Sequence, residues 1–220
     1  MAQLLRRFDP RTIYFITSHT AQSRYFMAPS DKMNQLIGGI LARAVHQCEV
    51  ELFAHAFASN HFHLLVRAPS SRAMSIFMQR LRSGIGMKVG QLVGWRGGFF
   101  AGRYRAEPIV DERDQLDHLV FLLDHSVDEG LVSAPWPGLS CVQSLLEDQA
   151  TSVHRWRDLH ESLTLAPLPG WLRLDPAERG LIIGQLAADI DRSHRSRPWK
   201  RERKRASGRA ALPQLRAAAV

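Results

Sequence analysis

Cysteine, tyrosine and long apolar runs are scarce in this sequence, and each scarcity excludes a class of protein. The two cysteines, Cys48 and Cys141, are too far apart for a disulfide scaffold or a thiolate metal site, which favours a reducing, cytoplasmic location. No apolar run approaches the ~20 residues that span a bilayer, and the first residues lack a secretory segment, so we expect neither membrane insertion nor export. Only three tyrosines are present, Tyr14, Tyr25 and Tyr104, which limits the candidates for any phenolic nucleophile.

Positive charge is concentrated near the C-terminus. The net charge is +8, and residues 192–209 hold nine lysines and arginines against one acid, Glu202, so the rest of the chain is balanced. Such a segment is typical of a disordered arm that binds a polyanion, because each neutralised phosphate releases a counterion. A merely solubilising tail is the alternative. The residues predicted to bind such a polyanion in this arm are Arg195, Arg197, Lys200, Arg201, Arg203, Lys204 and Arg205.

Hydrophobic periodicity predicts strands and helices along most of the chain. The expected strands are at 12–17, 49–58, 61–67 and 106–110, with a short turn at 59–60 joining the middle two. The expected helices are at 31–47, after an N-cap at Ser30, and at 73–93, 114–127, 153–163 and 176–193. We therefore divide the chain into a domain at 1–146, a helical extension at 147–191 and a basic, disordered tail at 192–220.

Two histidines alternate with apolar residues in the expected strand at 61–67. Because successive side chains of a strand point to opposite faces, His61 and His63 share one face while Phe62 and Leu64 share the other. Imidazole is the commonest side-chain metal ligand, and a strand holds both rings rigidly. The pair therefore predicts a metal site, and two half-exposed strand residues without a ligand are the alternative.

Aromatic and basic residues are interleaved at 95–105, which reads WRGGFFAGRYR. This composition suits a surface that stacks on nucleic-acid bases and binds phosphates. For Trp95 and Phe99 the alternative is a hairpin whose aromatic rings fill the core. The residues predicted to bind nucleic acid in this segment are Arg96, Arg103, Tyr104 and Arg105.

Residues 54–66, which read AHAFASNHFHLLV, resemble the His-hydrophobic-His motif of the HUH nucleases. Within that class the segment is most similar to the insertion-sequence-200-like, single-tyrosine transposases, and among these to the REP-associated tyrosine transposases. Weaker matches follow in the family's order, at the Gly-Arg-Tyr of 102–104 and the Gly-Leu-Val of 130–132. The resemblance covers roughly residues 11–146. It implies an α+β fold, a ferredoxin-like or RRM-like antiparallel sheet with helices on one face, followed here by C-terminal helices and the basic tail.

The resemblance also implies a chemistry. The family holds a divalent metal with the two histidines and a third polar residue, and a tyrosine hydroxyl attacks a DNA phosphodiester to form a covalent 5′-phosphotyrosine link. That tyrosine begins a YIxxNPxxxGLV string, which corresponds here to FLLDHSVDEGLV at 121–132. The nucleophile position is therefore Phe121, and the third metal ligand is His125. The family implies Mg²⁺ or Mn²⁺, and three histidines would also suit Zn²⁺.

Phe121 leaves three hypotheses open, each with hairpin-forming, single-stranded DNA as the partner. The first is a transposase that binds, cleaves and transfers DNA strands, with Tyr104 as the best substitute nucleophile. The second is a catalytically inactive DNA-binding descendant of a transposase. The third is a metal-dependent phosphodiesterase in which water at a three-histidine site attacks. Monomeric and dimeric states are both open.

Overall fold

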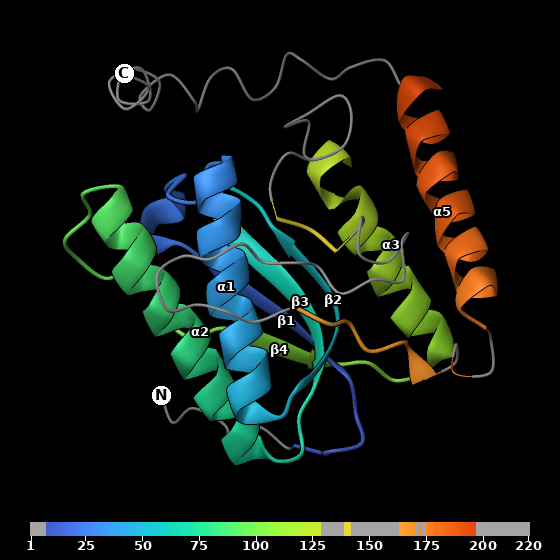
Figure 1. The fold of residues 1–220 in the computed structure, drawn as a ribbon, viewed down its shortest axis with the longest axis horizontal. Coiled ribbons are helices and arrows are strands. Elements are labelled where there is room, and N and C mark those ends of the chain that lie inside the picture. Colours follow the sequence, from blue (N-terminus) through green and yellow to red (C-terminus); the bar gives the residue numbers. More distant parts are fainter. Residues whose placement is uncertain (1–7, 129–138, 142–162, 170–171, 173–174, 197–220) are drawn as a thin grey trace.

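A four-stranded antiparallel sheet lies between two layers of helices (Figure 1). The computed structural model describes residues 8–128, 139–141, 163–169, 172 and 175–196. The strands are β1 (Tyr14–His19), β2 (Glu51–Phe57), β3 (His61–Arg67) and β4 (Arg105–Pro108), in the sheet order β2-β3-β1-β4. The helices are α1 (Asp31–Cys48), α2 (Ser71–Leu92), α3 (Glu112–Asp128) and α5 (Pro176–Ser196), with a short 3₁₀ turn, η1 (Ala21–Ser23).

The chain order β-α-β-β-α-β on this sheet is the ferredoxin-like arrangement, so the predicted fold class is confirmed. Each expected element within the described residues is present, with ends that differ by at most three residues. The side chain of Ser30 accepts a hydrogen bond from the Met33 amide, as expected of the α1 N-cap. The helix expected at 153–163 lies almost wholly outside the described residues. Helix α5 continues to Ser196, so the first residues assigned to the tail are helical.

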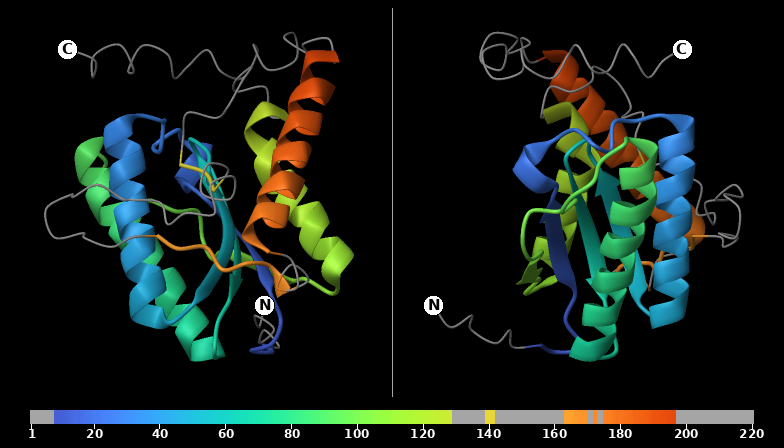
Figure 2. Two further views of the ribbon diagram at one scale, coloured as in Figure 1. Left: turned by 45° about the vertical axis from the view of Figure 1, so that its right-hand side comes forward. Right: turned by 90° about the vertical axis from the view of Figure 1, so that its left-hand side faces the viewer.

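Helices α1 and α2 cover one face of the sheet, as both views in Figure 2 show. Their apolar stripes pack on alternate strand residues, among them Ile16, Phe62 and Leu64. The two helices approach each other closely at Gly84, where a Cβ atom would lie 2.8 Å from Cγ2 of Ile40. This contact explains a glycine within a helix, where it is otherwise unfavourable.

Helix α3 covers the opposite face, and α5 packs on α3 (Figure 2). Leu119 and Leu122 of α3 are only 1% and 2% exposed and join a second core cluster with Phe15 and Leu65. None of the described helices has the length and apolar character needed to cross a membrane.

Candidate functional site

His61 and His63 lie on the sheet face that α3 covers. Their side chains emerge on the side opposite Phe62 and Leu64, as the alternation of β3 predicted. They are 5% and 6% exposed, and their ring centroids are 5.0 Å apart. Both rings are therefore buried and not half-exposed as the alternative assumed, and the metal site itself stays a prediction.

Each imidazole is oriented by a polar neighbour at Nδ1. The Nδ1 atom of His61 lies 2.6 Å from Oδ1 of Asn60, and that of His63 lies 3.0 Å from Oγ1 of Thr17. The Asn60 amide nitrogen donates to the Ser23 carbonyl at 3.4 Å, which turns the amide oxygen toward His61. Because an amide oxygen only accepts, this contact is a hydrogen bond when His61 donates from Nδ1.

Phe121 lies beside the histidine pair. Its ring approaches His63 edge-on with centroids 5.3 Å apart, and approaches Phe15 in the same way at 5.8 Å. Phe15 also stacks on His63 at 5.0 Å, with an angle of 11° between the planes. The Phe121 side chain is 42% exposed, so one part of the ring contacts the site and another faces solvent. Helix α3 thus brings residue 121 to His63.

His19 is a third histidine at this site, and the sequence analysis missed it. It lies directly opposite His61 in the β1–β3 register, and the two rings stack with centroids 5.1 Å apart. The expected first strand ended at residue 17, whereas β1 continues to His19. The available signal was the alternation of Phe15, Thr17 and His19, which places all three on one strand face.

Comparison with known proteins shows which family the residues around this site resemble. Residues 14–117 match the family model described as "Transposase IS200 like". These residues are therefore similar to the IS200-like transposases. The resemblance inferred from the histidine motif is therefore confirmed. The match ends at residue 117, so Phe121 and His125 lie just beyond the segment that the family model covers.

Comparison with solved structures found one that shares the fold of this IS200-like domain and another with a lower similarity. A REP-associated tyrosine transposase bound to a REP hairpin has a TM-score of 0.56 at 16% sequence identity, covering 73% of this chain and 98% of that one. A putative transposase from Deinococcus radiodurans R1 has a TM-score of 0.39 at 18% identity, covering 54% of this chain and 95% of that one. No match was found among the curated proteins.

IS200-like transposases of the HUH class use a divalent metal, and the two buried imidazoles fit such an ion. They are nitrogen donors held on one strand, and borderline cations such as Zn²⁺ accept imidazole readily. Among the described residues, no group of three or more histidine, cysteine, aspartate or glutamate side chains is arranged to hold a metal. His125 lies in α3, but its side chain is outside the described part of the chain, so its role as third ligand stays a prediction.

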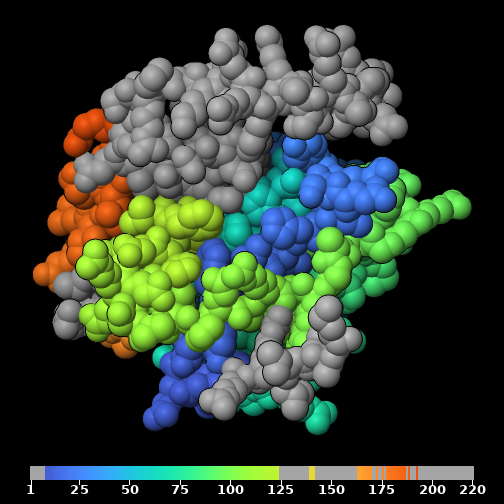
Figure 3. All heavy atoms as spheres, turned by 180° about the vertical axis from the view of Figure 1, so that it is seen from behind, coloured from blue at the N-terminus to red at the C-terminus, as the bar shows by residue number. Residues whose placement is uncertain are grey.

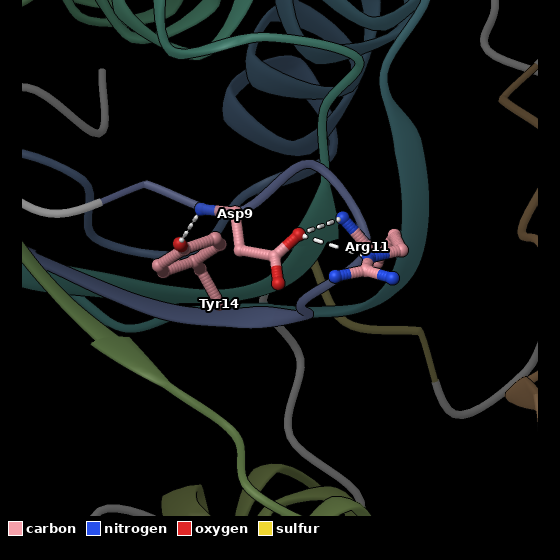
Figure 4. A network of polar contacts seen from close by, with 3 residues as sticks. All are labelled: Asp9, Arg11 and Tyr14. Atoms are coloured by element: carbon pink, nitrogen blue, oxygen red, sulfur yellow. Dashed lines mark hydrogen bonds and ion pairs between the residues drawn. The ribbon is translucent and has the colours of Figure 1, made fainter.

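Tyr14 and Tyr104 of the IS200-like domain lie away from the histidines. Both pack with the core cluster under α1 and α2, on the other side of the sheet from His63. The Tyr14 hydroxyl accepts a hydrogen bond from the Asp9 amide at 2.8 Å, and the Asp9 carboxylate in turn binds Arg11 (Figure 4). The structure therefore does not bring Tyr104 together with the histidines.

Tyr25, the third tyrosine, is 50% exposed in the loop between η1 and α1. This loop is tied to the β2–β3 turn, because the Met27 amide donates to the Ser59 carbonyl at 2.8 Å. The loop therefore borders the end of the sheet at which β3 begins with His61.

The predicted DNA-binding residues of the α2–β4 segment are on the surface. The side chains of Arg96, Arg103 and Arg105 are exposed. Arg105 lies opposite Thr17 in the β1–β4 register, so the two share a sheet face, and the Arg105 guanidinium pairs with Glu107. Seen from the face in Figure 3, α3, residues near β1 and residues near β4 are exposed next to one another.

The aromatic residues of that segment are largely structural. Phe99 is 6% exposed and packs on Phe26 with ring centroids 4.9 Å apart, so the core alternative is correct for this residue. Trp95 packs on Phe26 at 4.8 Å, and the Arg24 guanidinium lies 4.7 Å from the Trp95 ring centroid. Trp95 thus has one side toward the core and a cation on its ring.

The basic tail lies almost entirely outside the described residues. Arg195 is in the last turn of α5, but its side chain is not described. The DNA-binding role stays a prediction for this residue and for the others of the tail, which are Arg197, Lys200, Arg201, Arg203, Lys204 and Arg205.

Proposed function

We propose that this IS200-like domain binds hairpin-forming, single-stranded DNA beside His61 and His63, and that it does not form the covalent tyrosine–DNA link of its family. The observation that carries the proposal is the contact between Phe121 and His63, with ring centroids 5.3 Å apart. The residue that the Gly-Leu-Val register assigns to the nucleophile position lies beside the histidines, where the family's chemistry needs it. A phenyl ring has no hydroxyl with which to attack a phosphate.

Three observations support DNA as the ligand. The domain shares its fold with a transposase that was solved bound to a REP hairpin. Arg105 is exposed on the same sheet face as Thr17 and His63. The net charge of +8 is concentrated after residue 192, which favours binding to a polyanion.

The side chains around the histidines have separate roles in this proposal. His61 and His63, with His125 as third ligand, would hold a divalent metal, which offsets negative charge on a phosphate oxygen. Arg105 would donate charge-assisted hydrogen bonds to a neighbouring phosphate. The exposed part of Phe121 would stack on a base, a contact worth about 1–3 kcal/mol when an aromatic residue is replaced by alanine.

A binding and cleavage assay tests the proposal. The full chain is mixed with an end-labelled single-stranded hairpin and Mn²⁺, and the products are separated on native and denaturing gels. We expect wild type to shift the hairpin on the native gel and to give neither a covalent band nor a cleaved strand on the denaturing gel. We expect Phe121→Tyr to add a covalent band, because it restores the hydroxyl beside His63.

Matched variants separate the alternatives. Phe121→Leu should bind the hairpin and form no adduct, and adding His63→Ala to Phe121→Tyr should abolish the new band. A covalent band in wild type that disappears in Tyr104→Phe or Tyr25→Phe would identify a substitute nucleophile and refute the proposal. A cleaved strand without a covalent band would instead identify the phosphodiesterase in which water attacks.

A further inference from the structure

We propose that Thr17 and Asn60 are positioning residues that hold His61 and His63 in the same tautomer, with the proton on Nδ1 and the lone pair on Nε2. Two imidazoles on one strand can bind one metal ion together only if each turns an unprotonated nitrogen toward it. A neutral imidazole has one such nitrogen, and a hydrogen bond at the other nitrogen selects which one it is. The contacts with Asn60 and Thr17 are both at Nδ1, and an acceptor at Nδ1 places the ring proton there and the lone pair on Nε2, the atom that would bind the metal.

Asn60 fixes the orientation of the His61 ring, because a hydrogen bond holds the side-chain amide of Asn60 in place. Its nitrogen donates to the Ser23 carbonyl at 3.4 Å, so its oxygen faces Nδ1 of His61 at 2.6 Å. The Ser23 carbonyl is set by a loop in which Gln22 and Ser23 have φ angles of 55° and 53°, a strained conformation for residues other than glycine.

Backbone contacts hold this strained loop against the β2–β3 turn. The Thr20 amide donates to the Asn60 carbonyl at 2.8 Å, and the Thr20 hydroxyl lies 2.7 Å from the Arg24 carbonyl and 3.0 Å from that of Asn60. The conformation of the loop after β1 is thereby linked to the tautomer of His61.

Thr17 fixes the second ring from the neighbouring strand. It lies opposite His63 in the β1–β3 register, and its hydroxyl is 3.0 Å from Nδ1 of His63. A threonine in a strand has few side-chain rotamers, so the hydroxyl position is well defined. The hydroxyl can either donate or accept, and the proposal requires it to accept from the Nδ1 proton of His63.

Nitrogen NMR of the metal-free protein tests the tautomers directly. The full chain is labelled with ¹⁵N-histidine and observed at pH 8.5, and the two rings are assigned by comparison with His61→Gln and His63→Gln. We expect the unprotonated resonance of both rings to belong to Nε2. Assignment of the unprotonated resonance to Nδ1 in either ring would overturn the proposal.

Metal affinity then tests whether the hydrogen bonds of Thr17 and Asn60 to the two histidines strengthen metal binding. Binding of Mn²⁺ and Zn²⁺ is measured by calorimetry for wild type, Thr17→Val and Thr17→Ser. Loss of an outer-shell hydrogen bond to a ligating histidine typically weakens metal binding about 10–100-fold, which we expect for Thr17→Val and not for Thr17→Ser. Asn60→Leu should weaken binding similarly, whereas Asn60→Asp keeps an acceptor beside His61 and should retain it. Equal affinities for wild type, Thr17→Val and Asn60→Leu would refute the positioning role.

Ser18→Ala is the matched control. It removes a hydroxyl from the next residue of β1, whose side chain is 2% exposed and has no hydrogen-bond partner within the described part of the chain. We expect its metal affinity and both histidine tautomers to equal those of wild type.

This inference rests on the proposed function for the choice of metal as ligand, but its tests do not involve DNA. If the chain binds metal as proposed and does not bind a hairpin, the proposed function fails and the inference stands. If the hairpin binds and the tautomers differ from those expected, the inference fails alone.

Discussion

His55 makes the stability of this protein depend on pH in a predictable direction. It lies in β2 opposite Leu64, is 1% exposed, and neither ring nitrogen has a hydrogen-bond partner within the described part of the chain. Burial lowers the pKa of His55 from 6.5 to about 3, because the charged imidazolium loses its hydration. The folded state therefore holds this ring neutral at pH values where the unfolded chain binds a proton.

The direction of this pH dependence follows from the lowered pKa of His55. Because the unfolded chain takes up the proton first, the contribution of His55 to stability is complete above pH 6.5 and is lost progressively as the pH falls toward 3. Each pH unit within this window costs about 1.4 kcal/mol of unfolding free energy. Between pH 6.5 and pH 4 the loss is roughly 3 kcal/mol, a large share of the 5–15 kcal/mol of a typical domain.

Urea unfolding followed by tryptophan fluorescence between pH 7.5 and pH 4 measures this loss. The difference between wild type and His55→Leu isolates His55 from the other histidines. We expect His55→Leu to be more stable at pH 7.5 by roughly 1–2 kcal/mol, because it removes two buried nitrogens that have no partner among the described residues. This advantage should grow as the pH falls. Phe57→Leu is the control, because the ring centroids of Phe57 and His55 are 6.2 Å apart and phenylalanine does not titrate. This variant should change the unfolding free energy by the same amount at every pH. A constant difference between His55→Leu and wild type would refute the reasoning.

Three further predictions concern the helices and the DNA surface. Gly84→Ala should lower the unfolding free energy by roughly 1–2 kcal/mol in urea denaturation, because its Cβ would lie 2.8 Å from Cγ2 of Ile40 and the clash outweighs the gain in helix propensity. Ser30→Ala should cost about 1 kcal/mol in the same measurement, because it removes the hydrogen bond to the Met33 amide. Arg105→Ala should weaken hairpin binding and lower the slope of log affinity against log salt by about 1, as expected for one lost phosphate contact.

The sequence predicted those features that follow from local periodicity. Strand alternation correctly placed His61 and His63 on one face, and the serine before α1 correctly marked its start. The family register named Phe121, and α3 brings that residue to His63. Each of these inferences needs only the order of residues within one element, or one motif with a fixed spacing.

Features that depend on pairing between distant segments could not be predicted from the order of residues within one element. The contact of Thr17 with His63 joins residues 46 apart, and it exists only because β1 pairs with β3 in this register. His19 was missed because Ser18 and Thr20 are polar and ended the expected strand, although their burial, at 2% and 0% exposed, comes from the segments packed around them. Polar residues buried by tertiary contacts give no local hydrophobic signal.

The contacts of Phe121 make its replacement by tyrosine a clean test of chemistry. Phenylalanine and tyrosine share the same ring, so the variant can keep the edge-on contacts with His63 and Phe15. The side chain is already 42% exposed, so the added hydroxyl need not be buried without a partner. We therefore expect the stability of Phe121→Tyr to lie within about 0.5 kcal/mol of wild type, as for most surface substitutions. A variant that folds normally and binds the hairpin yet forms no adduct would then show that more than the hydroxyl is missing from this site.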